Sequence, residues 1–204
     1  DAIRENDARL KESIRLRKII IPRGEFLREI SLEFGKVIAV GGCHGKTTCT
    51  AMLSHVLAYS GKKFTCHIGG SDLRFSNSYC GGDDYFITEA CEYNKNFLRL
   101  KPDLSVVLNS DADHLECYGS TANLKNAYIK FAESAKSAVC LYGDLPVDGA
   151  VTFGFDDRAD YYARNIVGNG GKYSFTAYKN GKKLGKVNLN VYGKHNVLNA
   201  LAVI

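Results

Sequence analysis

The chain of 204 residues has no apolar run that approaches the roughly 18 residues of a membrane-spanning helix. Its N-terminal segment is charged and does not resemble a secretory signal. Internal repeats and low-complexity segments are absent as well. Because 45% of the residues are hydrophobic, the chain can bury one sizeable core. We therefore expect a soluble, cytoplasmic protein that makes no contact with a membrane.

The cysteines lack the spacing that a zinc site or a disulfide framework requires. There are seven of them, an odd number, and no two form a C-x-x-C pair. We therefore expect reduced and mostly buried thiols. Cys43 differs in its position, because it lies inside a glycine-rich segment where it could contact a ligand.

Long blocks of like charge are also missing. The 27 basic and 22 acidic residues leave a formal net charge of +5, without a polybasic tail. This mild excess suits a phosphorylated ligand as well as a nucleic acid. Nucleic-acid binding would rest on the net charge alone, since no basic stripe is present, so we expect no nucleic-acid partner.

The N-terminal part of the chain differs in pattern from the rest. Residues 2–18 have the spacing of an exposed helix, and a short apolar stretch, residues 19–21, ends at Pro22. This arrangement is typical of the end of one domain. We predict that residues 1–34 are such an end together with a linker, and that residues 35–204 form the main domain.

Strands and helices alternate in the main domain. Residues 36–40 predict a buried strand, which runs through glycines into a helix with its apolar positions within residues 51–57. A second helix is predicted over residues 121–136. Further short strands are predicted at residues 85–88, 104–108, 138–142 and 150–153. The alternation predicts an α/β fold, with a P-loop-type, mostly parallel sheet flanked by helices.

The pattern changes again near the C-terminal end. Residues 172–178 and 187–191 alternate between polar and apolar side chains. Asn180-Gly181 between them is the signal of a type I′ turn. We therefore predict a small antiparallel hairpin or sheet in this region.

The strongest chemical signal is the run GCHGKTT, which lies between the first predicted strand and the first long helix. Glycines let successive backbone N–H groups converge on phosphate oxygens, and the positive end of the helix dipole adds to the attraction. We expect Lys46 to reach the β and γ phosphates of a nucleotide, and Thr47 to offer its hydroxyl to Mg²⁺. The alternative is a glycine-rich turn with a surface lysine. The candidate nucleotide-binding residues of this loop are Gly42, Cys43, His44, Gly45, Lys46, Thr47 and Thr48.

The loop departs from the general Walker pattern in its length. That pattern would place glycine where Val40 stands, so the loop here has the compressed form G-x-x-G-K-T. The compressed form favours a narrower group of ATP-dependent enzymes over common GTPases and transporters.

Polar side chains follow two further predicted strands. Glu89 and Glu92 come directly after residues 85–88, at the edge where open parallel sheets bind ligands. A carboxylate there can hold Mg²⁺, which takes oxygen ligands. Residues 109–114 follow another strand, and His114, beside two acids, is a candidate ligand of a second cation or of a substrate carboxylate. Each would more often be a solvated or structural residue if it stood alone, but strand ends that meet at one crevice favour a functional site.

A fourth polar group opens the last predicted helix. His195, Asn196 and Asn199 lie there, and side-chain amides can both donate and accept hydrogen bonds on the edge of adenine. The alternative is an asparagine cap of the helix, which is the better interpretation for Asn196 taken alone.

Together these four groups, in this order and at these distances, resemble the Mur ligase family over nearly the whole chain. His44 before Gly45 and the Glu-Ala-x-Glu run at residues 89–92 resemble the branch that joins L-alanine to UDP-N-acetylmuramate. Other branches carry a carbamylated lysine in the helix after the Asp-His motif, where this chain has Tyr128. The absence of that lysine fits the alanine-adding branch.

The resemblance implies an ATP-dependent, amide-forming ligase of peptidoglycan precursor synthesis. Its substrates would be UDP-N-acetylmuramate and L-alanine, with ATP and Mg²⁺ as cofactors. The muramate carboxylate would attack the γ phosphate, and the amine of alanine would then displace phosphate from the acyl phosphate. Lys46, Glu89 and His114 would be catalytic, and the metal ligands would be Thr47, Glu89 and His114. The resemblance adds Asn109, His195, Asn196 and Asn199 to the nucleotide-binding residues of the loop.

The resemblance also implies a domain assignment. Residues 1–34 would be the remnant of an N-terminal UDP-binding domain with its linker, and residues 35–204 a central ATP-binding domain without its C-terminal part. We expect such a fragment to bind nucleotide weakly and to be inactive alone. Two alternatives stay open, a related Mur-type ligase that adds a peptide or glutamate, and a non-catalytic ATP-binding module, which would not need Glu89 and His114 near the phosphates.

Overall fold

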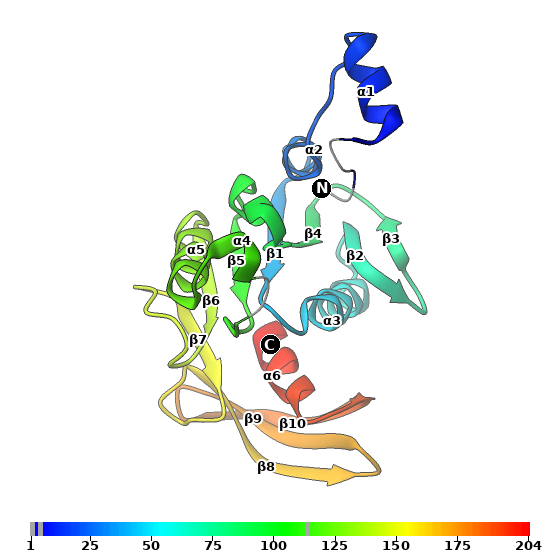
Figure 1. The fold of residues 1–204 in the computed structure, drawn as a ribbon. Helices are drawn as coiled ribbons and strands as arrows, with labels where there is room; N and C mark the ends of the chain where they lie inside the picture. The colour runs from blue at the N-terminus through cyan, green and yellow to red at the C-terminus, as the bar shows by residue number, and fades with distance from the viewer. Residues whose placement is uncertain (1–2, 4–5, 113–114) are drawn as a thin grey trace.

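The computed structural model describes residues 3, 6–112 and 115–204 of the chain. Within these residues one ten-stranded sheet carries helices on both faces (Figure 1). The strands are β1 (Lys36–Gly41), β2 (Phe64–Asp72), β3 (Ser76–Cys80), β4 (Tyr85–Glu89), β5 (Leu104–Val107), β6 (Ser137–Leu141), β7 (Val151–Gly154), β8 (Tyr161–Asn169), β9 (Lys172–Lys179) and β10 (Lys182–Tyr192). The helices are α1 (Ala8–Arg15), α2 (Arg23–Ser31), α3 (Lys46–Tyr59), the 3₁₀ helix η1 (Tyr93–Arg99), α4 (Leu115–Tyr118), α5 (Thr121–Glu133) and α6 (His195–Val203).

The strand order is β10-β9-β8-β7-β6-β5-β1-β4-β2-β3. All neighbours from β8 to β2 are parallel, whereas β3 at one end and β9 and β10 at the other are antiparallel. The predicted mostly parallel sheet is therefore confirmed. The predicted C-terminal hairpin is confirmed too, because Asn180 and Gly181 have φ of 46° and 78°, as a type I′ turn requires. The hairpin continues the main sheet and is not a separate layer.

Apolar cores cover both faces of the sheet, and a third cluster, Phe64, Cys66, Ile68, Phe75 and Ile87, packs against α3. Since side chains alternate along a strand, Ile38 and Val40 of β1 face one core and Ala39 faces the other. The core of Ile38 and Val40 packs against α3 and α6, whereas the core of Ala39 packs against α5 and η1. Tyr128 and Phe131 of α5 are fully buried in the second core. The sheet is covered on both faces, which explains the continuous apolar runs of its central strands.

Three strands of the structure are not in the predicted set. The apolar alternation of β2 is short, because its buried Phe64, Cys66 and Ile68 are followed directly by two glycines. All five residues of β3 are exposed, so β3 shows no apolar pattern. β8 lies in the alternating region but was not recognised as a strand of its own. Its register with β9 shifts between Arg164 and Val167, where Asn165 has a φ of 52°, and this irregularity interrupts the alternation.

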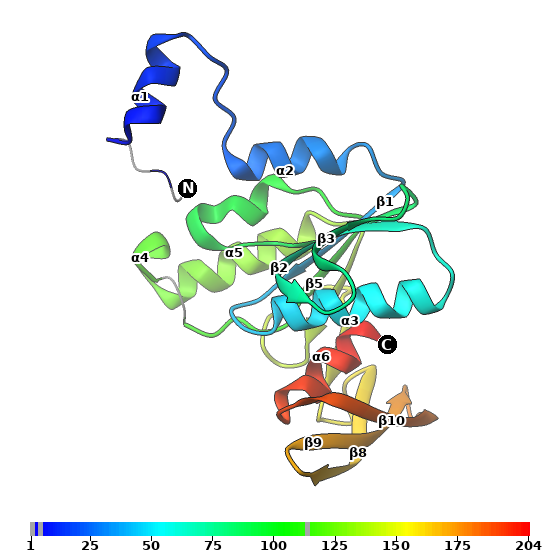
Figure 2. The ribbon, with the colours of Figure 1, turned by 90° about the vertical axis from the view of Figure 1, so that its right-hand side faces the viewer.

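The helix α1 projects away from the rest of the chain (Figures 1 and 2). The helix predicted over residues 2–18 is shorter than expected, since α1 covers Ala8–Arg15 and contains no buried residue. Residues 19–21 are exposed and form no strand. The helix α2 was not predicted, and it lies against η1, where Arg99 forms an ion pair with Glu25. No helix among the described residues is long and apolar enough to cross a membrane.

Candidate nucleotide-binding site

The glycine-rich loop joins the end of β1 to the start of α3, as predicted. Gly42 and Gly45 have φ of 135° and 86°, which side chains rarely permit. A Cβ atom at Gly42 would also lie 3.0 Å from Leu108 Cβ. The loop encloses a cavity of about 270 Å³ that is lined by Cys43, His44, Gly45, Lys46, Thr47 and Thr48. Six of the seven loop residues predicted from the sequence therefore line one hollow at a helix N-terminus, and Gly42 provides the turn into it.

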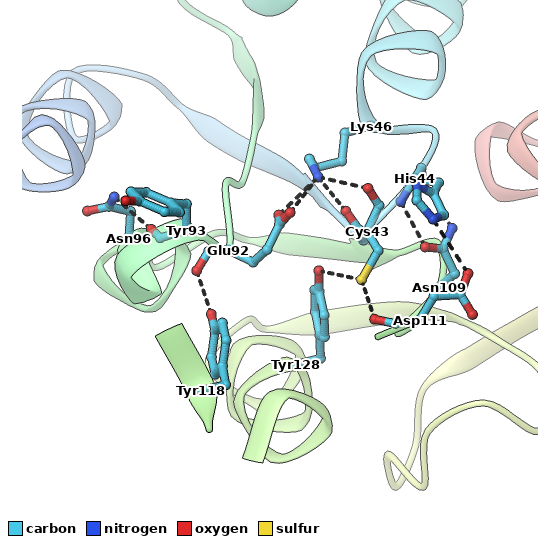
Figure 3. Close-up of polar contacts among 11 residues, drawn as sticks. Cys43, His44, Lys46, Glu92, Tyr93, Asn96, Asn109, Asp111, Tyr118 and Tyr128 are labelled. Carbon is cyan, nitrogen blue, oxygen red and sulfur yellow. Dashed lines mark hydrogen bonds and ion pairs between the residues drawn. The ribbon is translucent and has the colours of Figure 1, made fainter. Parts of the chain in front are cut away.

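The end of β5 braces this loop. The Asn109 amide bonds both polar groups of the His44 main chain, because its Oδ1 accepts from His44 N at 2.9 Å and its Nδ2 donates to His44 O at 2.9 Å (Figure 3). Cys43 Sγ lies 2.8 Å from the carbonyl oxygen of Asp111. Asn109 thus lies at the loop, and its amide is directed to the main chain of the loop.

Lys46 is directed toward a buried carboxylate. Its Nζ lies 3.0 Å from Glu92 Oε1 and 2.9 Å from Glu92 Oε2, and it donates to Gly42 O at 2.6 Å. The Lys46 side chain is 16% exposed and the Glu92 side chain 1%. The sequence placed Glu92 near the site but assigned the functional role to Glu89. Lys46 and Glu92 lie far apart in sequence, so tertiary packing decides that they pair. The only sequence signal for the pair was the Glu-Ala-x-Glu run at residues 89–92.

Glu89 and Thr47 lie on either side of the glycine pair of β2. Gly69 N donates to Glu89 Oε1, and a Cβ atom at Gly70 would lie 2.9 Å from Thr47 Cγ2. Side chains at these two glycines would therefore collide with both candidate metal ligands. Sequence reasoning missed Gly69 and Gly70, although two adjacent glycines at the end of a strand are a signal of close backbone approach.

A hydroxyl from Thr47 and a carboxylate from Glu89 are the hard oxygen ligands that Mg²⁺ prefers, so these residues fit that ion. His114, the third predicted ligand, lies outside the described residues. Within the part of the chain that the structure describes, no group of three or more His, Cys, Asp or Glu side chains forms a metal site. Thr48 lines the loop cavity next to Thr47.

The start of α6 lies against the other side of the loop. Asn199 and Asn196 are buried, and Asn199 Nδ2 donates to Asn196 Oδ1 at 2.7 Å while Asn196 Nδ2 donates to Tyr192 O at 2.8 Å. A Cβ atom at Gly45 would lie 2.6 Å from Asn199 Oδ1, so the Asn199 amide packs directly on the loop. His195 is exposed. The N-cap of α6 is Lys194, and no side chain caps the helix, so the capping interpretation of Asn196 is wrong: its amide instead donates to the main chain just before the helix.

A second cavity of about 270 Å³ adjoins the loop between the end of β5 and α6. Its walls combine apolar side chains with polar groups from four segments: His44, Gly45, Leu108, Asn109, Asp111, Leu141, Asp144, His195, Leu198 and Asn199. Three of the four residues predicted to bind nucleotide outside the loop line this cavity: Asn109, His195 and Asn199. The fourth, Asn196, lies behind the cavity wall and accepts a hydrogen bond from Asn199.

Two tyrosines form a wall behind the loop. Tyr118 donates its hydroxyl to Glu92 O at 2.5 Å, and the Tyr128 hydroxyl lies 3.6 Å from Cys43 Sγ (Figure 3). Burial, followed by the charge of Glu92, raises the pKa of both phenols well above the usual value. Both tyrosines therefore stay neutral and can donate at any pH near 7.

The ends of β1, β4 and β5 and the helices α3 and α6 thus meet around the glycine-rich loop, whose cavity is lined by a lysine and two threonines. This arrangement defines a P-loop-type nucleotide-binding domain of the α/β class. A family profile of the Mur ligase middle domain matches residues 40–204, and the chain belongs to the Mur ligase family.

Similar proteins carry names from that family. A UDP-N-acetylmuramate--L-alanine ligase of Clostridium novyi (strain NT) is 39% identical over 194 residues, covering 89% of this chain and 42% of that protein. The crystal structure of the UDP-N-acetylmuramate-alanine ligase MurC of Thermotoga maritima has a TM-score of 0.90 and 32% identity, over 100% of this chain and 48% of that one. A MurF ligase of Thermotoga maritima, solved in complex with ADP, shares the fold at a TM-score of 0.66 and 17% identity, over 91% of this chain and 49% of that one. The chain spans about half the length of the curated relatives it matches.

Proposed function

We propose that this chain is the central, ATP-binding part of a cytoplasmic ligase that joins L-alanine to UDP-N-acetylmuramate through an acyl phosphate. The observation that carries the proposal is the hollow of about 270 Å³ at the start of α3, with Lys46 and Thr47 in its wall and Glu89 across the glycine pair of β2. The names of the relatives support L-alanine and UDP-N-acetylmuramate as the substrates. The MurF complex with ADP supports a nucleotide in this fold.

The physical difficulty of the reaction is that a carboxylate must approach a polyphosphate, which is also negative. Main-chain N–H groups of the loop and the positive end of α3 bind phosphate oxygens, and the Lys46 ammonium adds a full positive charge. Thr47 and Glu89 would hold Mg²⁺, with His114 as a further ligand, and the bound ion would neutralise part of the phosphate charge. The residues of the loop thereby lower the repulsion that opposes attack of the muramate carboxylate on the γ phosphate.

We place the nucleoside in the second cavity, beside the loop. His195 and Asn199 line this cavity, and apolar side chains such as Leu108 and Leu198 offer a surface for a base. Asn196 acts through Asn199, whose amide it orients. Asn109 positions the loop, since its amide forms hydrogen bonds with both the N–H and the carbonyl oxygen of His44.

The other steps of the reaction belong to the full-length protein. We propose that residues 1–34 are the end of a UDP-binding domain with its linker, and that residues 35–204 belong to the ATP-binding domain. The exposure of α1 and of residues 19–21 supports this division, although α2 packs on η1. We expect residues 1–204 alone to bind nucleotide weakly and to form no amide.

Calorimetry with MgATP tests the nucleotide site. We expect wild-type protein to bind and Lys46→Ala to lose most of the binding, because the loop then lacks its only lysine. Lys186→Ala is a matched control, because it removes one positive charge from an exposed position of β10 that lines neither cavity of the site. Wild-type protein that is folded but does not bind, or Lys46→Ala with unchanged affinity, would contradict the assignment of the loop.

A substrate comparison tests the ligase itself. The full-length protein is mixed with ATP and UDP-N-acetylmuramate, and phosphate release is measured with L-alanine, glutamate or an alanine-containing peptide as the amine. Turnover with L-alanine, and with neither of the other two amines, supports the proposal. Turnover with glutamate or the peptide would favour the related ligases, and nucleotide binding without turnover on any amine would favour a non-catalytic module.

A further inference from the structure

The Lys46 ammonium, which we expect to bind the phosphates of the nucleotide, is paired with the Glu92 carboxylate. Both Glu92 oxygens lie within 3.0 Å of Nζ, and the same nitrogen donates to Gly42 O at 2.6 Å. Cys43 O lies at 3.4 Å. An ammonium has three N–H donors, and four protein oxygens lie within 3.4 Å of this nitrogen. Lys46 lines the loop cavity, but its ammonium is already bound by the Glu92 carboxylate and by carbonyl oxygens of the loop.

Hydrogen bonds to its main-chain oxygen hold Glu92 in place. Glu92 O accepts from the Tyr118 hydroxyl at 2.5 Å and from Lys95 N at 2.9 Å. The chain then turns through Asn94 and Lys95, which both have left-handed φ, of 51° and 57°. Because the carboxylate is enclosed and its backbone is held, Lys46 is the partner that must move when a phosphate enters.

We propose that Glu92 is a positioning residue that holds Lys46 in the nucleotide-free loop and competes with the β and γ phosphates for its ammonium group. This inference rests on the proposed nucleotide site. Glu92 acts in two ways in the same direction, since it withholds the lysine and keeps a negative charge buried beside the bound phosphates. It thereby limits affinity for nucleotides that reach the lysine, and it leaves contacts of the base and ribose unaffected.

The test is calorimetry on the full-length protein with wild type, Glu92→Gln and Glu92→Asp. Glutamine keeps the shape and one acceptor but removes the charge. We expect Glu92→Gln to bind MgATP and MgADP roughly tenfold more tightly, the size of effect expected for one hydrogen bond to a charged group. AMP lacks β and γ phosphates, so its affinity should stay unchanged. Aspartate draws the carboxylate back from Nζ, so Glu92→Asp should give a smaller gain in the same direction.

Glu12→Gln is the matched control. Glu12 forms an exposed ion pair with Arg15 on α1 at 2.6 Å, so its substitution changes the net charge equally and leaves the loop untouched. Circular dichroism establishes that each variant is folded. If Glu92→Gln does not fold, the comparison of wild type with Glu92→Asp decides the question by itself.

The outcomes separate this inference from the nucleotide site on which it rests. Tighter MgATP and MgADP binding without a change for AMP supports the competition by Glu92. Wild-type binding with an unchanged or lower affinity of the Glu92 variants would overturn the role of Glu92 and leave the nucleotide site standing. An equal gain for AMP would overturn it as well, because the effect would not arise at the β and γ phosphates. Folded proteins that all fail to bind would overturn the nucleotide site itself.

Discussion

Replacement of Asn109 by alanine removes both hydrogen bonds that join the end of β5 to the His44 main chain, each 2.9 Å long. One such bond contributes about 1 kcal/mol to stability, and water can replace part of it at this exposed position. We therefore expect Asn109→Ala to lower the free energy of unfolding by about 1 to 2 kcal/mol. If the loop must then be ordered by the nucleotide, MgATP affinity falls roughly 5- to 30-fold.

Urea unfolding and MgATP calorimetry on the same samples measure both effects. Asn109→Asp keeps the acceptor for His44 N–H but loses the donor to His44 O, and it adds a negative charge beside the phosphates. Its stability should lie between wild type and Asn109→Ala, whereas its MgATP affinity should fall below both. Asn169→Ala, at the exposed end of β8, serves as a control for the loss of an amide. The reasoning is refuted if Asn109→Ala destabilises the protein and binds MgATP as wild type does.

Three further results are expected. Gly45→Ala should abolish MgATP binding in calorimetry and lower the melting temperature, because φ is 86° and the new Cβ would lie 2.6 Å from Asn199 Oδ1. Asp160 accepts hydrogen bonds from Thr152 N and Oγ1, which hold its pKa below the usual 3.8. Its stabilising effect is therefore present above pH 3.8 and lost as the pH falls through the lowered pKa. In urea unfolding measured at several pH values, Asp160→Ala should therefore lose less of its free energy of unfolding than wild type does as the pH falls. Phe131→Ala should cost about 3 to 5 kcal/mol in urea unfolding, because the ring is fully buried.

The central strands could be predicted because each is a short apolar run buried on both faces. β2 was not predicted, since its second half contains Gly69 and Gly70, which have no side chains where the strand passes Glu89 and Thr47. The two glycines leave room for Glu89 and Thr47 and weaken the strand signal at the same time. β3 is an exposed edge strand, so burial places no apolar pattern on it.

The same distinction holds within the candidate site. The loop is a local signal, because glycines, lysine and threonine act through consecutive main-chain positions. The partner of Lys46 depends on tertiary packing, so the sequence could place Glu89 and Glu92 near the loop without showing which of them bonds the lysine. The amides of Asn109 and Asn199 were expected at the nucleotide, and the structure directs them to the loop main chain and to Asn196.

The main chain of the loop and its lysine are therefore controlled by different residues. Asn109, which follows β5, bonds the loop main chain before any ligand arrives, and Asn199 of α6 packs against Gly45. A loop that is held in this way needs less ordering when phosphate binds. Glu92 instead governs where the charge of Lys46 points. Because Asn109 and Glu92 contact different atoms of the loop, their substitutions should alter MgATP affinity additively and with opposite sign. Strong non-additivity in Asn109→Ala/Glu92→Gln would mean that the backbone and the lysine move together.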